Sequence, residues 1–137
     1  MPGRNRPVSV LMVEDSAFDV RMTERAFHGL PFEFTSVSDG QSAIQTITSR
    51  PNDFDLVLLD LNLPRVRGDE VLRQIKLNPM SRRLPVIILT SSDNPDDVER
   101  AWEDQCAGFV TKPATPSKLR EFAEAASTWW AGHCRLR

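Results

Sequence analysis

The sequence predicts an α/β protein with a five-stranded parallel sheet that is covered by helices on both faces. Five short apolar runs typical of strands alternate strictly with stretches whose apolar residues recur at helical spacing. Two of the runs, at residues 8–13 and 86–89, have no polar face, as expected for strands buried on both sides. Parallel neighbours need crossover helices, and the alternation supplies them. The expected strand order is 2-1-3-4-5.

The first two strand–helix units lie in the N-terminal part of the chain. Residues 8–13 form the first strand, and Asp15 or Ser16 caps the helix that follows. A weakly alternating second strand is expected at residues 32–38, and the second helix begins at residues 39–40. Four apolar residues at four-residue steps should line the inner face of the first helix: Phe18, Met22, Ala26 and Leu30.

The next two units follow the same pattern. The third strand is expected at residues 55–60, the strongest strand signal, and the fourth at residues 85–90. Asn94 caps the fourth helix, and Pro95 and two acids suit its first turn. The apolar face of the third helix should carry Val71, Leu72 and Ile75, and that of the fourth Val98, Ala101 and Trp102.

A short fifth strand at residues 108–111 leads to a last helix, which begins at Pro116 and releases the chain at Gly132. We therefore expect three regions along the chain. They are a disordered lead at residues 1–7, a single domain at residues 8–131 and a C-terminal tail at residues 132–137.

Length, charge and cysteine content restrict the class of protein. The chain has 137 residues, 40% of them hydrophobic, which suffices for one domain with one core. The net charge is −2 and the basic residues are dispersed, so we expect no direct binding to nucleic acid. Cys106 and Cys134 form neither a disulfide framework nor a metal cluster, and no long apolar run occurs. We expect a cytoplasmic protein that does not bind membranes.

Charged and polar side chains follow four of the predicted strands at the same edge of the sheet. They are Glu14, Asp15, Asp60, Thr90 and Lys112. Carboxylates that lie close together repel one another unless a proton or a cation sits among them. Mg²⁺ takes one or two protein carboxylates and leaves positions for water and phosphate oxygens. We therefore expect a Mg²⁺ site here, in which Mn²⁺ or Ca²⁺ could substitute.

The same residues suit phosphoryl transfer. An aspartate carboxylate can carry a phosphoryl group when positive charge neutralises the incoming oxygens. Asp60 would be this nucleophile, Mg²⁺ and Lys112 would supply the charge, and Thr90 would donate a hydrogen bond. Each residue alone has an ordinary explanation as a helix cap, a turn or a surface residue. Their shared position at one sheet edge favours the functional interpretation.

These residues, at these separations, resemble the receiver domains of two-component response regulators, which have the chemotaxis-type, flavodoxin-like fold. The resemblance covers residues 8–130 and implies a switch protein that is phosphorylated by a sensor histidine kinase. Such a protein is not an enzyme in the usual sense, because it catalyses only its own phosphorylation and dephosphorylation. The resemblance rests on the following positions: Glu14, Asp15, Asp60, Asn62, Pro64, Gly68, Thr90 and Lys112.

The resemblance also implies a role for each site residue. Asp15 and Asp60 would ligate Mg²⁺ directly, Glu14 would act through water, and the backbone carbonyl of Asn62 would complete the metal site. Asp60 would accept the phosphoryl group. The remaining roles follow in the same way: Lys112 pairs with the phosphoryl group, and Thr90 and Phe109 form a switch pair in which the hydroxyl moves toward the phosphoryl group and the ring moves inward.

The expected partners follow from the resemblance and from three tryptophans. The stretch at residues 59–64 resembles stand-alone regulators of phytochrome-type histidine kinases, so we expect such a kinase as partner. Trp129 and Trp130 are adjacent on the last helix and cannot face the same core, so at least one should face solvent or a partner. Together with Trp102 they are expected to belong to a homodimer interface.

Two other functions remain open from the sequence. Phosphatases with an aspartate nucleophile also place this residue after a parallel strand, but they need a second acid two residues later, where Asn62 stands. Turnover of a small phosphate ester would favour this alternative. The second alternative is a binding module with the same fold but without phosphotransfer. The complete acidic set and Lys112 argue against it.

Overall fold

A computed structural model describes residues 6–134, and residues 1–5 and 135–137 lie outside the description. Within this range, five strands alternate with five α-helices, and a π-helix follows at Ser127–His133. The strands are β1 (Val8–Val13), β2 (Phe32–Val37), β3 (Leu56–Leu59), β4 (Val86–Thr90) and β5 (Gly108–Thr111). The α-helices are α1 (Ala17–Ala26), α2 (Gly40–Ser49), α3 (Gly68–Leu77), α4 (Pro95–Glu103) and α5 (Pro116–Ala126).

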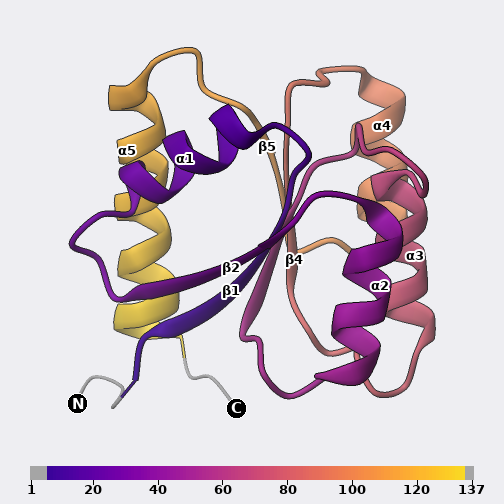
Figure 1. Ribbon diagram of the computed structural model, residues 1–137. Helices are drawn as coiled ribbons and strands as arrows, with labels where there is room; N and C mark the ends of the chain where they lie inside the picture. The colour runs from indigo at the N-terminus through magenta and orange to yellow at the C-terminus, as the bar shows by residue number, and fades with distance from the viewer. Residues whose placement is uncertain (1–5, 135–137) are drawn as a thin grey trace.

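The strands form one parallel sheet in the order β2-β1-β3-β4-β5, which confirms the predicted α/β class and topology. Helices α1 and α5 cover one face of the sheet, and α2, α3 and α4 cover the other (Figure 1). The direction of strand order reverses between β1 and β3. In such sheets the binding crevice lies outside the carboxyl ends of the strands at this reversal.

Burial of apolar side chains on both faces holds the sheet between its two helix layers. All residues of β3 and β4 are buried, as expected for central parallel strands. On the α2–α4 side, Val71, Leu72 and Ile75 of α3 pack into the largest cluster. On the α1–α5 side, Phe27 makes edge-to-face contacts with Phe32, Phe34 and Phe122. The buried apolar residues therefore determine where each strand ends, and the polar residues that follow the strands lie just beyond these ends.

Four of the five α-helices, α1, α2, α4 and α5, begin at side-chain caps, whereas α3 has none. Ser16 accepts a hydrogen bond from the backbone N–H of Asp19, and Asp39 accepts one from that of Ser42. Of the two caps that the sequence allows for α1, Ser16 is therefore the one used. Asn94 caps α4 as predicted.

Two predicted helix faces are only partly correct. Phe18 is 62% exposed, because it lies in the first turn of α1 and at the rim of a cavity rather than over the core. Leu30 lies beyond the end of α1. Trp102 is 53% exposed, while Ala101 of the same helix is buried. One residue along a helix rotates a side chain by about 100°, which takes Trp102 away from the sheet.

The C-terminal region differs from the prediction. The chain does not leave the last helix at Gly132, because a π-helix continues to His133. Trp130 packs against the apolar clusters on the α5 side of the sheet, whereas Trp129 is 56% exposed. Most of the predicted lead, residues 1–5, and half of the predicted tail, residues 135–137, lie outside the described residues. No described helix combines the length and apolarity that crossing a bilayer requires.

Candidate functional site

Four of the predicted site residues meet at the carboxyl edge of the sheet, each at the end of a different strand. Glu14 follows β1, Asp60 follows β3, Thr90 ends β4 and Lys112 follows β5. The strand register aligns these ends, because the last residue of β1 pairs with the last residue of β3. The convergence that the sequence predicts is therefore present.

Asp60 is nearly buried, and both of its carboxylate oxygens have hydrogen-bond donors. The hydroxyl of Thr90 donates to Oδ1 over 2.7 Å, and the backbone N–H of Asn62 donates to the same oxygen over 3.2 Å. Lys112 Nζ donates to Oδ2 over 3.1 Å. The carboxylate is thus held in one orientation at the crevice.

A tight cluster of acids surrounds this carboxylate. One carboxylate oxygen from each of Glu14, Asp15 and Asp60 lies within 4.8 Å of the other two. Glu14 is 3% exposed and Asp15 is exposed, so the cluster runs from the protein interior to the surface. Hard oxygen donors in this number fit a divalent cation such as Mg²⁺ or Mn²⁺, which would also relieve the repulsion among them.

The electrostatics of Glu14 reflect this crowding. Burial raises the pKa of Glu14 most strongly, and the charge of Asp60 adds to the effect. Hydrogen bonds from Lys112 and from the backbone N–H of Ser16 oppose the rise, and the resulting pKa is about 7. A bound proton and a bound cation are therefore alternatives at this carboxylate near neutral pH.

Lys112 is the positive charge of the site. Its ammonium donates to Glu14 over 2.6 Å, to Asp19 over 2.8 Å and to Asp60 over 3.1 Å. Burial lowers the pKa of Lys112, but the hydrogen bonds to Asp19 and Glu14 and the charge of Asp60 raise it by more. The net pKa lies above that of an ordinary lysine, so the ammonium stays protonated at neutral pH.

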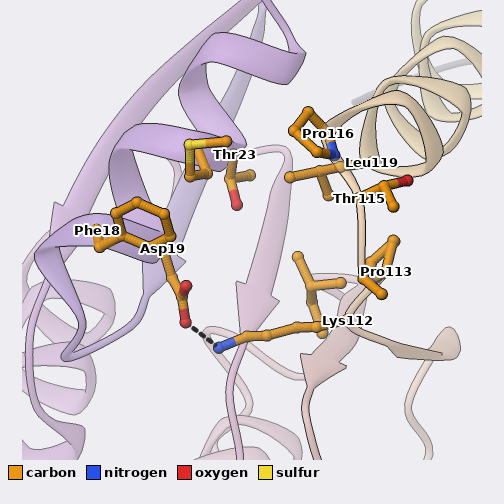
Figure 2. A pocket seen from close by; sticks show the side chains of 11 residues that line it. Phe18, Asp19, Thr23, Lys112, Pro113, Thr115, Pro116 and Leu119 are labelled. Atoms are coloured by element: carbon orange, nitrogen blue, oxygen red, sulfur yellow. Dashed lines mark hydrogen bonds and ion pairs between the residues drawn. The ribbon is translucent and has the colours of Figure 1, made fainter.

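Asp19 also contacts Lys112, although the sequence did not predict it as a site residue. It lies in the first turn of α1, where an acid is expected simply because it suits the helix dipole. Figure 2 shows its carboxylate pointing at the ammonium of Lys112 across the gap between α1 and the segment after β5. The only sequence feature that could have indicated Asp19 is its spacing of four residues from Asp15, which is about one helical turn.

A cavity of about 200 Å³ lies beside this ion pair, between α1 and the start of α5. Its walls are mainly apolar, with Asp19 and Lys112 at one end (Figure 2). The apolar lining includes Phe18, Met22 and Leu119. The Lys112 side chain is 20% exposed, so the site is open to solvent rather than sealed.

The other predicted residues lie in varied surroundings. Phe109 is half-buried and packs against the α2–α4 core cluster. Asn62 is exposed. Trp102 and Trp129 are exposed but belong to helices on opposite faces of the sheet (Figure 1). The structure therefore gathers the acids, Thr90 and Lys112 into one site, and leaves the tryptophans outside it.

Comparison with known proteins points to one family. The family described as response regulator receiver domain matches residues 10–124. Response regulator Rcp1 of Synechocystis sp. is 35% identical over 136 residues, which cover 92% of this chain and 90% of that protein. Probable methanogenesis regulatory protein FilR2 of Methanothrix harundinacea is 34% identical over 135 residues, which cover 92% of this chain and 85% of that protein.

Two solved structures are similar over nearly their whole length. The crystal structure of the Mn²⁺-bound form of Rcp1 has a TM-score of 0.85 and 33% identity, and the match covers 96% of this chain and 99% of that one. The crystal structure of the phosphorylated cyanobacterial phytochrome response regulator RcpA has a TM-score of 0.87 and 31% identity, with coverage of 95% and 98%.

Proposed function

This chain belongs to the response regulator receiver domain family, and from this premise we propose that Asp60 is its phosphoacceptor. The protein is a regulator of a two-component phosphorelay. The observation that supports Asp60 most directly is its position: a nearly buried carboxylate with Lys112 on one oxygen and Thr90 on the other. Positive charge and a hydrogen-bond donor are thus already aimed at the atoms that would react.

In the proposed reaction, a carboxylate oxygen of Asp60 attacks the phosphorus of a phosphohistidine on a sensor kinase. The new O–P bond forms as the P–N bond breaks, and the imidazole leaves and takes up a proton. Lys112 balances the charge of the phosphoryl oxygens, because its raised pKa keeps it protonated. Hydrolysis of the acyl phosphate by water returns the carboxylate and phosphate, so the only turnover is the protein's own.

Mg²⁺ is the cation that we propose for the acidic cluster. Asp15 and Asp60 would be direct ligands, Glu14 would act through water, and the backbone carbonyl of Asn62 would complete the set. When bound, the cation would neutralise oxygens of the transferring phosphoryl group. The proposal is supported by the 4.8 Å cluster of carboxylate oxygens and by the relative Rcp1, whose structure was determined with Mn²⁺.

Thr90 and Phe109 are proposed as the switch pair. The Thr90 hydroxyl now donates to Asp60, and it would donate to a phosphoryl oxygen instead once that group is attached. Moving the hydroxyl frees space, which the half-buried ring of Phe109 would fill. The phosphoryl group would thus favour one of two existing conformations through contacts made only there.

The partner and the place of action are also proposals. A sensor histidine kinase of the phytochrome type is supported by the likeness to RcpA, a phytochrome response regulator. We propose the cytoplasm as location, residues 8–131 as the functional domain, and a homodimer interface that uses Trp102, Trp129 and Trp130. The exposure of Trp102 and Trp129 supports such an interface. Sedimentation in both phosphorylation states tests it, and a monomer in each would contradict it.

Intact mass spectrometry after incubation with acetyl phosphate and Mg²⁺ tests the phosphoacceptor. The parent should gain the mass of one phosphoryl group, and Asp60→Asn should gain none. Asp53→Asn is a matched control, because Asp53 is an exposed acid that forms an ion pair with Arg50 and does not belong to the acidic cluster. Phosphorylation of the Asp60→Asn protein would overturn the assignment. Steady release of product from a small phosphate ester would revive the phosphatase alternative.

A further inference from the structure

Lys112 has one carboxylate partner that does not belong to the acidic cluster. The cluster consists of Glu14, Asp15 and Asp60, whose oxygens lie within 4.8 Å of one another. Asp19 is not among them, yet its Oδ2 accepts a hydrogen bond from Lys112 Nζ over 2.8 Å. This contact joins residues 93 positions apart. The metal site therefore leaves the presence of Asp19 unexplained.

Asp19 holds the ammonium from a rigid and accessible position. The residue lies in the first turn of α1, where its backbone N–H is fixed by the cap oxygen of Ser16 over 3.2 Å. Its side chain is 35% exposed, compared with 2% for Glu14 and 5% for Asp60. The carboxylate that holds Lys112 in Figure 2 is thus more exposed than the other two acids that contact this ammonium.

The number of donors on Lys112 makes this third contact informative. An ammonium has three protons, and here three carboxylates accept them. Phosphorylation changes one of these acceptors, because the Asp60 carboxylate becomes an acyl phosphate whose charge lies on the phosphoryl oxygens. A cation bound in the acidic cluster would compete with Lys112 for a second acceptor, Glu14. Asp19 lies outside both the acidic cluster and the reacting carboxylate, so neither change removes it as an acceptor for Lys112. Without it, the long flexible lysine side chain would lose its fixed orientation just when the phosphoryl group needs it.

We propose that Asp19 is a positioning residue, which tethers the Lys112 ammonium beside Asp60 while the bonds of Asp60 change. The proposal rests on the proposed role of Asp60 as phosphoacceptor. Asp19 would not touch the phosphoryl group and would act only through Lys112. Because Asp19 is anionic, it would also repel a phosphodonor, and the test must separate this effect of charge from the tether.

Two substitutions of Asp19 separate the effect of its charge from its role as a tether. Asp19→Asn removes the charge but keeps a side-chain oxygen that can accept from Lys112, whereas Asp19→Ala removes both. Both variants lose the negative charge, so any gain in phosphorylation rate from weaker repulsion of the phosphodonor should be the same in both. The tether therefore predicts that Asp19→Ala is phosphorylated about tenfold more slowly than Asp19→Asn, the loss expected for one hydrogen bond to a charged group. The rate is measured by intact mass over time with acetyl phosphate and Mg²⁺.

Glu24→Ala is the matched control, because it removes an exposed acid from the same helix; its rate should equal that of the parent. If Asp19→Ala does not fold, Asp19→Ser replaces it, since the serine hydroxyl is too short to reach Lys112. Equal rates for the Asn variant and the Ala or Ser variant would overturn the tether. Failure of the parent itself to be phosphorylated would instead overturn the proposed function.

Discussion

Thr90 and Asp60 lie thirty residues apart and at the ends of neighbouring strands, and a buried hydrogen bond of 2.7 Å joins their side chains. Thr90 is fully buried and Asp60 is 5% exposed. The bond therefore couples the reactive carboxylate directly to the end of β4. A change in the charge or size of Asp60 must alter the position of the Thr90 hydroxyl, because the two side chains are in direct contact.

Replacing Thr90 by valine should destabilise the protein by about 1–3 kcal/mol, since a buried carboxylate loses a donor while the shape of the residue is kept. Replacement by serine keeps the hydroxyl and should cost less. The measurement is the free energy of unfolding by urea without divalent cations. Equal stability of the two variants would show that the hydrogen bond contributes nothing.

The sequence was sufficient to predict the fold and most of the site, because both depend on strand ends. The apolar runs show where each strand stops, and parallel strands bring their carboxyl ends to one edge. Glu14, Asp60, Thr90 and Lys112 meet there for this reason. Their contacts follow from topology, and topology follows from the alternation of strands and helices.

The structural features that could not be predicted from the sequence depend on how the helices are oriented on the sheet. Asp19 reaches Lys112 only because α1 packs beside α5 on the same face of the sheet, which no local pattern specifies. The exposure of Phe18 has the same origin, since it depends on how far α1 extends past the core. The π-helix that carries Trp129 also has no sequence pattern of its own.

Cation binding should weaken as the pH falls through about 7, the pKa to which burial and Asp60 raise Glu14. Below this pH, Glu14 binds a proton and the cluster loses a negative charge, so cation and proton compete. We expect affinity for Mg²⁺ or Mn²⁺ to be roughly tenfold weaker near pH 6 than near pH 8. Calorimetric titration at several pH values gives the profile.

Glu14→Gln is the control for this profile, because its amide does not titrate. The variant should bind the cation more weakly, and its affinity should change less between these pH values. In the absence of a cation, the stability of the protein depends on pH in the opposite direction. The raised pKa of Glu14 in the folded state stabilises the protein at low pH, and this contribution is lost as the pH rises through about 7. A parent affinity that does not vary with pH would contradict the assignment.

Arg120 should contribute to stability by joining α5 to the end of α1. Its guanidinium donates to the backbone carbonyl of Ala26 over 2.9 Å and to that of His28 over 2.8 Å. Arg120→Ala removes both bonds at a helix C-terminus and should cost about 1–2 kcal/mol in unfolding free energy. Glu124→Ala removes only the exposed ion pair with Arg120 and should be within about 0.5 kcal/mol of the parent. Similar losses in both variants would assign the effect to the ion pair instead.

Gly68 should not tolerate a side chain, because the backbone of the phosphoacceptor lies against it. A Cβ atom at this position would come within 2.1 Å of the carbonyl oxygen of Asp60 and 2.6 Å of the Cα of Leu61. Backbone atoms cannot rotate away, so Gly68→Ala must displace either α3 or the segment after β3. We expect a loss of about 3 kcal/mol in unfolding free energy and slower phosphorylation of Asp60.

Gly132→Ala is the matched control for this last prediction. The nearest atom to a Cβ there is the carbonyl oxygen of Ser127 at 3.8 Å, an ordinary contact, and the residue is helical. Alanine in a helix should stabilise the protein by up to about 1 kcal/mol. Urea unfolding and the phosphorylation time course measure both variants. If Gly68→Ala behaved like Gly132→Ala, close packing against Asp60 would not be what requires glycine at this position.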